Sequence, residues 1–320
     1  MLSIVVQFAI LFFDSKSNVT RMTMAASISV AKTFTLNNGH CIPAVGLGTS
    51  RIKKDEMENV IKTALDVGYR HFDSAYMYSN NVVLGGVLSD VFASGEIKRD
   101  ELFITSKYTV HGIRPADVMK CMKECLENLK MGYVDLFLIH QPVEFTAKEE
   151  DSESVEKHLY LDPTTDYLGI WKEMEKLVGS GLTKSIGVSN FNQKQLTEIL
   201  QICKIKPAVI QTECHPYLQE NELLQFCKEN DIVMEDLGAL GSTNIDKESS
   251  GFDFSQNETI KDISKRHDRS IVQTLLRYQL QRGVVVLPII SNAARLKENI
   301  NVFEFSLTSS EMSDLSYLDI

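Results

Sequence analysis

Four polar residues stand at or just beyond the ends of three short apolar runs: Asp73, Tyr78, Lys107 and His140. Each alone has an ordinary structural explanation. An aspartate after a strand usually caps the next helix, a lysine there usually reaches solvent, and a histidine that ends an apolar strand is more often a satisfied core residue. Because four such residues at consecutive run ends are hard to explain as coincidence, we treat them as one candidate site.

These residue types suit the protonation of an oxygen atom that gains negative charge. Tyr78 is the candidate acid, although a free tyrosine holds its proton up to a pKa of about 10. Lys107 nearby would favour the phenolate and lower that pKa, and Asp73 would hold the ammonium group in place. His140 would donate a hydrogen bond that orients a carbonyl group. Together the four residues would suit a reaction such as the reduction of a carbonyl by hydride, which needs a general acid beside the carbonyl oxygen.

A regular alternation of elements would bring these residues together. Short apolar runs rich in β-branched residues predict eight strands, over residues 44–48, 71–73, 102–106, 136–140, 185–189, 209–213, 232–235 and 284–288. Stretches of helical period lie between them, over residues 56–67, 115–129, 167–178, 193–202, 220–229 and 271–281. Strands that alternate with helices pair in parallel through right-handed crossovers, so we expect an α/β fold, a closed (β/α)8 TIM barrel. Left-handed glycines are expected to end three helices, at Gly68, Gly132 and Gly283.

No linker or change of composition divides the chain, so we expect one barrel domain over residues 33–320 and an N-terminal extension over residues 1–32. Two long segments, 142–165 and 238–254, follow strand ends. They are predicted to be long loops at the C-terminal face, where barrel enzymes place their active sites.

The N-terminal extension begins with an apolar run over residues 2–13, which is too short to span a bilayer. Three interpretations remain: a weak signal peptide, an apolar anchor, or translated sequence upstream of a start at Met22 or Met24. We favour the last, and therefore expect a cytoplasmic protein without a membrane span; secretion is the alternative.

The composition excludes some partners. A formal net charge of −10 in 320 residues, without a run of Lys or Arg, argues against nucleic-acid binding. The six cysteines are scattered without a CxxC pair, so we expect reduced core thiols. Cys121 and Cys125 share a helix face, but no histidine or further cysteine lies nearby in the sequence to complete a zinc site, and no bound metal is expected.

Five segments that carry or flank these residues resemble those of the aldo-keto reductase family, in order and with similar spacing. They are GYRHFDSAYMY at 68–78, FITSK at 103–107, LFLIH at 136–140, GVSNF at 187–191 and QTECHPY at 211–217. The resemblance, to the aldose and aldehyde reductase type, runs from about Phe34 to the C-terminus. It implies a barrel, the same four catalytic roles, a nicotinamide cofactor, a small-molecule carbonyl substrate and a monomer.

The resemblance also implies cofactor contacts. Ser189, Asn190 and Gln211 would bind the nicotinamide carboxamide; a helix N-cap is the alternative role of the first two. The remaining contacts would lie beside the cofactor, near its pyrophosphate, and at its adenosine end: Thr49 and Arg51, Leu240 and Ser242, and Ser291, Arg295, Glu298 and Asn299.

Two departures from the family bear on the cofactor. Leu237 stands where a tyrosine usually stacks on the nicotinamide, a loss of roughly 0.5–1.5 kcal/mol. Ile289 replaces the lysine that meets the 2′-phosphate of NADPH, and losing one charge-assisted contact costs on the order of 1.5–3 kcal/mol. We expect NADPH, with NADH as the alternative.

A third departure concerns the substrate. Ser50, Thr109 and Gln141 occupy positions that are often tryptophan in the family. Simple drift would explain this, but a wider, more polar mouth would suit a bulky hydroxylated substrate such as a polyhydroxylated steroid ketone.

Three other functions or folds compete with an active reductase. A barrel that binds nucleotide only as a structural or regulatory ligand is favoured by Leu237 and Ile289. An open dinucleotide-binding fold is suggested by Gly46 and Gly48 before a helix and by Asp73 after the next strand, but Arg51 stands where the third glycine belongs. A barrel hydrolase is disfavoured because no paired carboxylates are expected at the strand ends.

Overall fold

The structure of the protein is a computed structural model. It describes residues 32–109, 113–147, 159–162, 164–240 and 253–319. The predicted extension, apart from Lys32, and Ser242 lie outside these residues. Within them, no helix is both long and apolar enough to cross a membrane.

Eight parallel strands pair in the order in which they follow one another along the chain. They are β3 (Leu47–Gly48), β4 (His71–Asp73), β5 (Phe103–Lys107), β6 (Val134–Ile139), β9 (Thr183–Ser189), β10 (Val209–Thr212), β11 (Val233–Asp236) and β12 (Val285–Val286). Parallel bridges from Val45 to Val286 and from Gly48 to Ile289 join the two ends of the sheet. The strands therefore close into the predicted (β/α)8 barrel.

Closure of the sheet overturns the open dinucleotide-binding fold. Gly46 has a packing role in the barrel: a Cβ atom there would lie 2.7 Å from the His71 ring and 2.6 Å from the Leu287 side chain. The glycine thus makes room for side chains inside the barrel.

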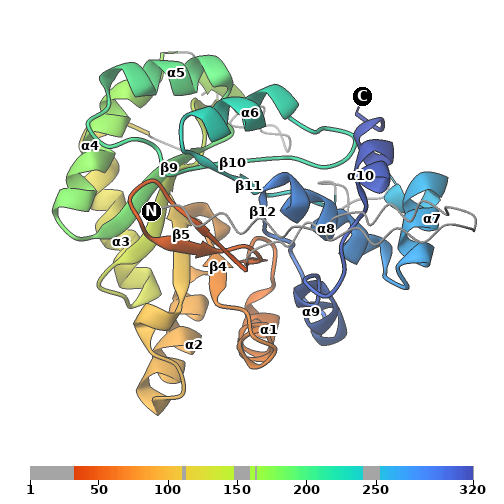
Figure 1. The fold of residues 1–320 in the computed structure, drawn as a ribbon. Helices are drawn as coiled ribbons and strands as arrows, with labels where there is room; N and C mark the ends of the chain where they lie inside the picture. Colours follow the sequence, from red (N-terminus) through yellow and green to blue (C-terminus); the bar gives the residue numbers. More distant parts are fainter. Residues whose placement is uncertain (1–31, 110–112, 148–158, 163, 241–252, 320) are drawn as a thin grey trace, which may run out of the picture.

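Helices surround the strands (Figure 1). They are α1 (Lys54–Asp66), α2 (Asn81–Ser94), α3 (Val118–Leu129), α4 (Tyr167–Gly179), α5 (Gln193–Ile202), α6 (Asn221–Glu229), α8 (Ile271–Arg282) and α9 (Ala293–Ile300). Two more, α7 (Glu258–Arg266) and α10 (Ser309–Ser316), pack beside α8 around a separate buried cluster. All six predicted helices are present within a few residues, whereas α2, α7, α9 and α10 were not predicted.

Helix α2 escaped prediction because its apolar residues do not follow one stripe, and because it contains Gly85 and Gly86. A Cβ atom at Gly85 would lie 2.5 Å from the Asn128 carbonyl oxygen of α3. The glycine is thus required where the two helices cross.

Two of the three predicted helix-ending glycines are left-handed: Gly68 has φ 105° and Gly283 has φ 88°. The prediction for Gly132 was wrong. Helix α3 ends instead at Lys130, which takes the left-handed conformation with φ 53°. Lysine pays a steric penalty there that glycine would avoid.

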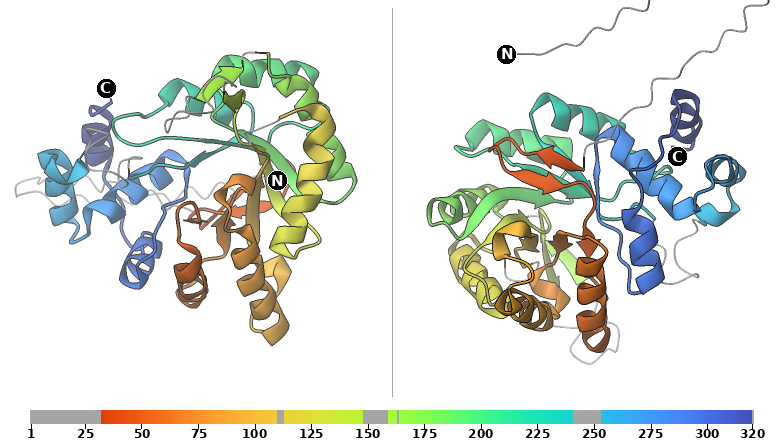
Figure 2. Two further views of the ribbon diagram at one scale, coloured as in Figure 1. Left: turned by 180° about the vertical axis from the view of Figure 1, so that it is seen from behind. Right: turned by 60° about the horizontal axis from the view of Figure 1, so that its bottom comes forward.

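A hairpin of β1 (Thr33–Thr35) and β2 (Cys41–Pro43) closes the N-terminal end of the barrel (Figure 2). Leu36 and Ile42 belong to a buried cluster with apolar side chains from the strands. The Asn37 side chain donates to the Pro207 carbonyl oxygen at 2.8 Å, which fixes the hairpin to the loop before β10. The hairpin and the strands thus fill this end of the barrel with apolar side chains.

The predicted loop 142–165 contains a hairpin that was not expected, formed by β7 (Glu144–Ala147) and β8 (Leu159–Asp162). Residues 241–252 of the other predicted loop lie outside the residues that the structure describes.

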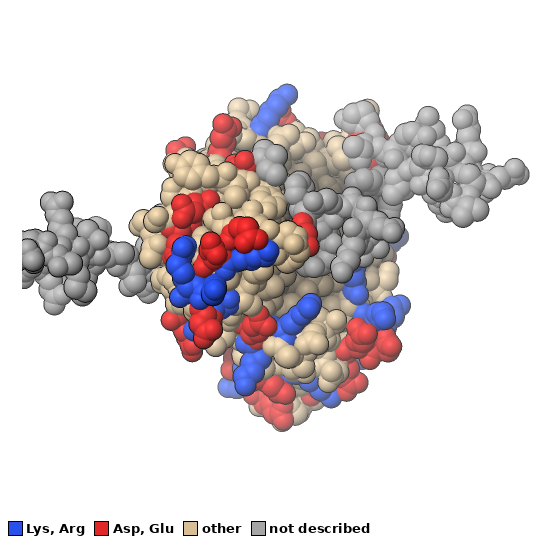
Figure 3. All heavy atoms as spheres, turned by 90° about the vertical axis from the view of Figure 1, so that its right-hand side faces the viewer, with Lys and Arg blue, Asp and Glu red and all other residues tan. Residues whose placement is uncertain are grey.

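Acidic and basic side chains are intermixed on the face shown in Figure 3.

All six cysteines are free thiols, but only four are buried. Cys41 is exposed and Cys203 is half-buried, so the expectation of six core thiols was wrong for these two. Among the residues that the structure describes, no group of three or more His, Cys, Asp or Glu side chains could hold a metal ion.

Candidate active site

A cavity of about 470 Å³ opens at the C-terminal ends of the strands. Its polar lining comprises Ser50, Arg51, Asp73, Tyr78, His140, Gln141 and Asn190. The rest of the lining is glycine and apolar side chains: Gly48, Met77, Leu237, Gly238, Ala239, Leu240, Leu287, Pro288 and Ile289. The cavity thus joins the predicted catalytic rim to a largely apolar wall.

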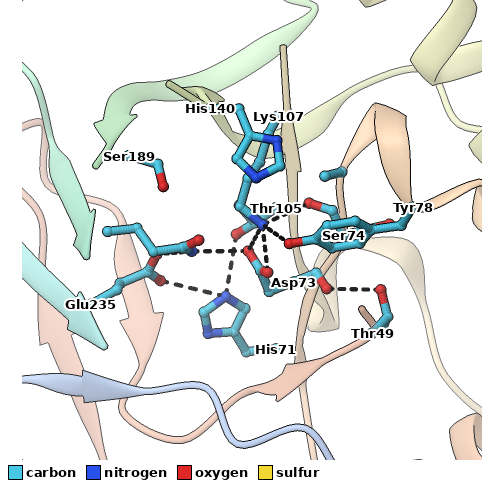
Figure 4. A network of polar contacts seen from close by, with 12 residues as sticks. Thr49, His71, Asp73, Ser74, Tyr78, Thr105, Lys107, His140, Ser189 and Glu235 are labelled. Atoms are coloured by element: carbon cyan, nitrogen blue, oxygen red, sulfur yellow. Dashed lines mark hydrogen bonds and ion pairs between the residues drawn. The ribbon is translucent and has the colours of Figure 1, made fainter. Parts of the chain in front are cut away.

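Lys107 lies at the centre of the predicted tetrad (Figure 4). Its Nζ atom donates to the two carboxylate oxygens of Asp73 at 2.5 and 2.8 Å and to the Ser74 carbonyl oxygen at 3.0 Å. It also lies 3.1 Å from the Tyr78 hydroxyl oxygen. The His140 ring meets the Tyr78 ring edge-on, with centroids 5.9 Å apart. The structure therefore brings all four predicted residues together.

Strand pairing explains this convergence. Asp73 ends β4 in register with Thr105 of β5, and side chains two residues apart on a strand face the same way, so Lys107 follows on the same interior face. His140 comes directly after β6, the next strand. The carboxyl ends of the parallel strands lie at one rim of the barrel. Lys107 therefore lies beside Asp73 and Ser74, although 34 and 33 positions separate it from them in the sequence.

Tyr78 ends a short 3-10 helix, η1 (Tyr76–Tyr78), rather than a strand. Two asparagines missed in the sequence hold this turn. Asn80 donates to the Thr49 carbonyl oxygen at 2.8 Å, and Asn81 donates to the Ala75 carbonyl oxygen at 3.0 Å. Adjacent asparagines after a tight turn are a signal for such backbone contacts, because their amides compete well for free carbonyl groups.

Burial raises the pKa of Tyr78 above its ordinary value, and the Lys107 charge acts in the opposite direction without overcoming burial. Lys107 thus lowers the pKa of Tyr78 as expected, but the net pKa is raised. The physical reason is desolvation of the phenolate by the barrel walls. A raised pKa keeps the phenol protonated at neutral pH, which is the form that an acid requires.

The other two titratable partners also have fixed charge states. Burial opposes the charge on Lys107, but Asp73 and Tyr78 outweigh it and raise the pKa of the ammonium group. Burial, assisted by the Lys107 charge, lowers the pKa of His140 to about 3. At neutral pH the site thus holds a charged lysine and a neutral imidazole, which can donate one hydrogen bond.

Beneath the rim, a second carboxylate approaches Asp73. The Gln211 amide nitrogen donates to Asp73 Oδ2 and to Glu235 Oε2, each at 3.0 Å. The expectation that no two carboxylates would be paired at the strand ends was therefore wrong. Glu235 is fully buried, however, and does not line the cavity, so the pair does not form a hydrolase site. An acidic residue at an inward position of a predicted strand was the signal for it.

The predicted nicotinamide contacts lie at two levels. Asn190 lines the cavity, while Ser189 and Gln211 are buried just below it. The Asn190 side chain donates to the His140 carbonyl oxygen at 3.0 Å. The alternative role of residues 189 and 190 as a helix N-cap was wrong, because Asn192 caps α5.

The remaining predicted cofactor residues are spread more widely. Arg51, Leu237 and Leu240 line the cavity, whereas the Thr49 hydroxyl is buried and donates to the Asp73 carbonyl oxygen at 2.9 Å. The residues predicted at the adenosine end lie in and before α9, outside the cavity lining: Ser291 and Arg295, which are exposed, half-buried Glu298, and buried Asn299.

Two of the three predicted substrate residues, Ser50 and Gln141, line the cavity. Thr109 does not; its backbone instead hydrogen-bonds to the Cys121 thiol. Met77, Leu287 and Pro288 line the cavity but were not predicted, because apolar residues after strands carry no signal that separates a pocket wall from the core.

The chain matches the sequence model of the aldo/keto reductase family over residues 43–320. Aldo-keto reductase family 1 member C1 of Macaca fuscata fuscata is 42% identical over 294 residues, which cover 89% of this chain and 90% of that protein. Prostaglandin F synthase 1 of Bos taurus is 39% identical over 291 residues, with the same coverage of 89% and 90%. The solved structure of the aldose reductase from Schistosoma japonicum is similar with a TM-score of 0.82 at 36% identity, and the match covers 91% of this chain and 93% of that one.

Proposed function

The chain belongs to the aldo/keto reductase family and is an NAD(P)H-dependent oxidoreductase, and on this premise we propose that it reduces a bulky ketone or aldehyde with Tyr78 as the general acid. The observation that carries the proposal is the Tyr78 hydroxyl, which lies 3.1 Å from a buried lysine ammonium group and lines the cavity. Proton donation is thus available at the place where a carbonyl oxygen can enter.

Tyr78 acts by giving its proton to the carbonyl oxygen as that oxygen becomes an alkoxide. Lys107 stabilises the phenolate that remains, and Asp73 holds the ammonium group by two short hydrogen bonds. Since an alkoxide is a far stronger base than a phenolate, the raised pKa of Tyr78 does not prevent the transfer.

His140 orients the carbonyl group. Its Nδ1 atom is buried without a hydrogen-bond partner, and the ring is neutral because burial lowers its pKa to about 3. A neutral imidazole beside Tyr78 can donate one N–H to the carbonyl oxygen without competing for the tyrosine proton.

The cavity also fits a nicotinamide ring. Asn190 offers a polar edge, Leu237 and Leu240 offer apolar contact, and Ser189 and Gln211 lie just beneath. A bound reduced nicotinamide would supply the hydride. We propose NADPH as the preferred cofactor, with NADH close behind, because Ile289 leaves Arg295 as the one predicted cation for a 2′-phosphate.

The proposed substrate has a bulky apolar skeleton, such as a steroid ketone. The apolar wall of the cavity supports this, and Ser50 and Gln141 offer hydrogen bonds to hydroxyl groups on the skeleton. Two relatives, Prostaglandin F synthase 1 and Dihydrodiol dehydrogenase 3 of Bos taurus, carry names that refer to prostaglandin and dihydrodiol chemistry.

A single substitution at the mouth tests the substrate class. In Gln141→Trp the added ring should narrow the cavity, so kcat/KM for a steroid ketone should fall by about ten-fold or more, while a small aldehyde is reduced as before. The measurement is the loss of reduced-nicotinamide absorbance with each substrate. Equal losses for both substrates would contradict a bulky substrate, and cofactor binding without turnover of any carbonyl would favour the regulatory nucleotide-binding alternative.

A further inference from the structure

One buried acid in the barrel lacks the partners that a buried carboxylate needs. Glu235 on β11 is fully buried, and its Oε1 atom has no hydrogen-bond partner. The nearest cationic candidate is His71 Nε2, at 3.7 Å from that oxygen. Burying a carboxylate without full hydrogen bonding is costly, so a role beyond packing is indicated.

A continuous set of contacts leads from this acid to the proposed proton donor (Figure 4). Glu235 Oε2 and Asp73 Oδ2 each accept from the same Gln211 nitrogen at 3.0 Å. Asp73 in turn accepts from Lys107 at 2.5 and 2.8 Å. Lys107 lies 3.1 Å from the Tyr78 hydroxyl. The Gln211 amide and the Asp73–Lys107 ion pair therefore stand between Glu235 and Tyr78.

We propose that Glu235 is a positioning residue that sets, through Gln211 and by its own charge, how strongly the Asp73–Lys107 pair stabilises the Tyr78 phenolate. The inference deepens the proposed function, since it rests on Tyr78 as the acid.

The charges around Glu235 give the direction of the effect. The titratable groups that face it are His71 and Asp73 on β4 and Lys107 on β5; its in-register neighbours on β10 and β12, Gln211 and Val285, carry no charge. Burial lowers the pKa of His71 to about 4, so this ring is neutral in use. A protonated Glu235 leaves one anion and one cation behind Tyr78, whereas an ionised Glu235 adds a second anion that opposes the phenolate.

The switch falls in an accessible range of pH. Burial, reinforced by the negative charge of Asp73, raises the pKa of Glu235 to about 8. Near neutral pH the acid is mostly protonated, and it becomes charged before a buried tyrosine does. Ionised Glu235 therefore holds the proton on Tyr78 to a higher pH than a neutral residue at this position would.

A matched pair of variants separates this effect from loss of a buried acid in general. Asp236 is the next residue on β11, is also fully buried, and has an Oδ2 atom without a partner. Successive side chains on a strand point to opposite faces, so Asp236 faces away from the barrel interior. Glu235→Gln and Asp236→Asn thus make the same chemical change on two sides of one strand.

The readout is the ionisation of Tyr78, followed by ultraviolet difference spectroscopy as each protein minus its own Tyr78→Phe form. Glu235→Gln should lower the midpoint by about one pH unit, the size expected when one unit charge is removed across several ångströms of protein. Asp236→Asn should leave the midpoint unchanged. Glu235→Val, which is also neutral, should reproduce the shift and serves if the glutamine variant does not fold.

An unshifted Tyr78 midpoint in folded Glu235→Gln or Glu235→Val would overturn the inference. So would an equal shift in Asp236→Asn. Because the titration needs no turnover, a shift without any carbonyl reduction would support the role of Glu235 and reject the proposed function, while Tyr78-dependent reduction without a shift would do the reverse.

Discussion

The charge state of the site depends on a lysine that water cannot reach. Lys107 is fully buried, and the Asp73 carboxylate and the Tyr78 hydroxyl take its hydrogen bonds. Because Asp73 and Lys107 end neighbouring strands and Tyr78 follows β4 by five residues, the tetrad could be predicted from spacing together with a resemblance. The net pKa of Tyr78 could not, since it depends on how completely the folded walls exclude water.

The burial of Glu235 and its link to Asp73 could not be predicted from the sequence, for a related reason. It meets Asp73 through Gln211, across sequence separations of 138 and 24 residues. An acid at the end of an apolar run is usually exposed, and only closure of the barrel places this one inside.

A substitution at Ile289 tests the cofactor assignment at the same scale. Ile289 is 42% exposed at the edge of the cavity, so Ile289→Lys can place an ammonium group there without entering the core. One charge-assisted contact is worth on the order of 1.5–3 kcal/mol, so NADPH should bind about ten-fold or more tightly. Fluorescence titration measures the Kd values, and Ile289→Met is the control. An equal decrease in the Kd values of NADPH and NADH would show that residue 289 does not contact the 2′-phosphate.

At the scale of elements, the short apolar runs were sufficient to predict all eight barrel strands, and the helical period was sufficient to predict six of the helices. They failed where another force decides the structure. Helix α2 is fixed by packing against α3 rather than by an apolar stripe, and β7 pairs with β8 inside a segment whose polar composition indicated a loop. Turn chemistry also failed once, at the end of α3.

That failure gives a stability prediction. Lys130 is exposed and left-handed with φ 53°, so Lys130→Gly should relieve strain and stabilise the protein by about 0.5–1 kcal/mol. Gly132→Ala is the reverse control: its φ is not in the left-handed range and nothing lies within 4 Å of a Cβ atom there, so that change should not destabilise the protein. Urea denaturation measures both, and a destabilised Lys130→Gly would contradict this account of the helix end.

At the scale of the whole molecule, an apolar floor and a polar rim divide the barrel interior, and buried titratable groups lie between them. The fold could be predicted because alternating strands and helices admit few arrangements. These groups make stability depend on pH. His71 and His140 have lowered pKa values of about 4 and about 3, so the stability they contribute is complete above about pH 6.5 and is lost on acidification.

Glu235 acts with the opposite sign. Its folded-state pKa of about 8 lies above the ordinary value of 4.5, so its contribution is complete at low pH and is lost as the pH rises through about 8. Between about pH 6.5 and about pH 8 the free energy of unfolding should therefore fall, by up to about 1.4 kcal/mol per pH unit for this one proton. Glu235→Gln should flatten that slope in urea denaturation at a series of pH values. A slope that stays the same would mean that Glu235 is already ionised at neutral pH.

The most direct test of the central claim is the rate of carbonyl reduction by the protein and by its Tyr78→Phe variant, with the Kd of NADPH measured on both. Loss of the general acid should lower kcat by about 10²–10⁴-fold, because that is the usual contribution of a positioned proton donor, and cofactor binding should change little. A Tyr78→Phe variant that reduces the same carbonyl substrate at the wild-type rate would contradict the account.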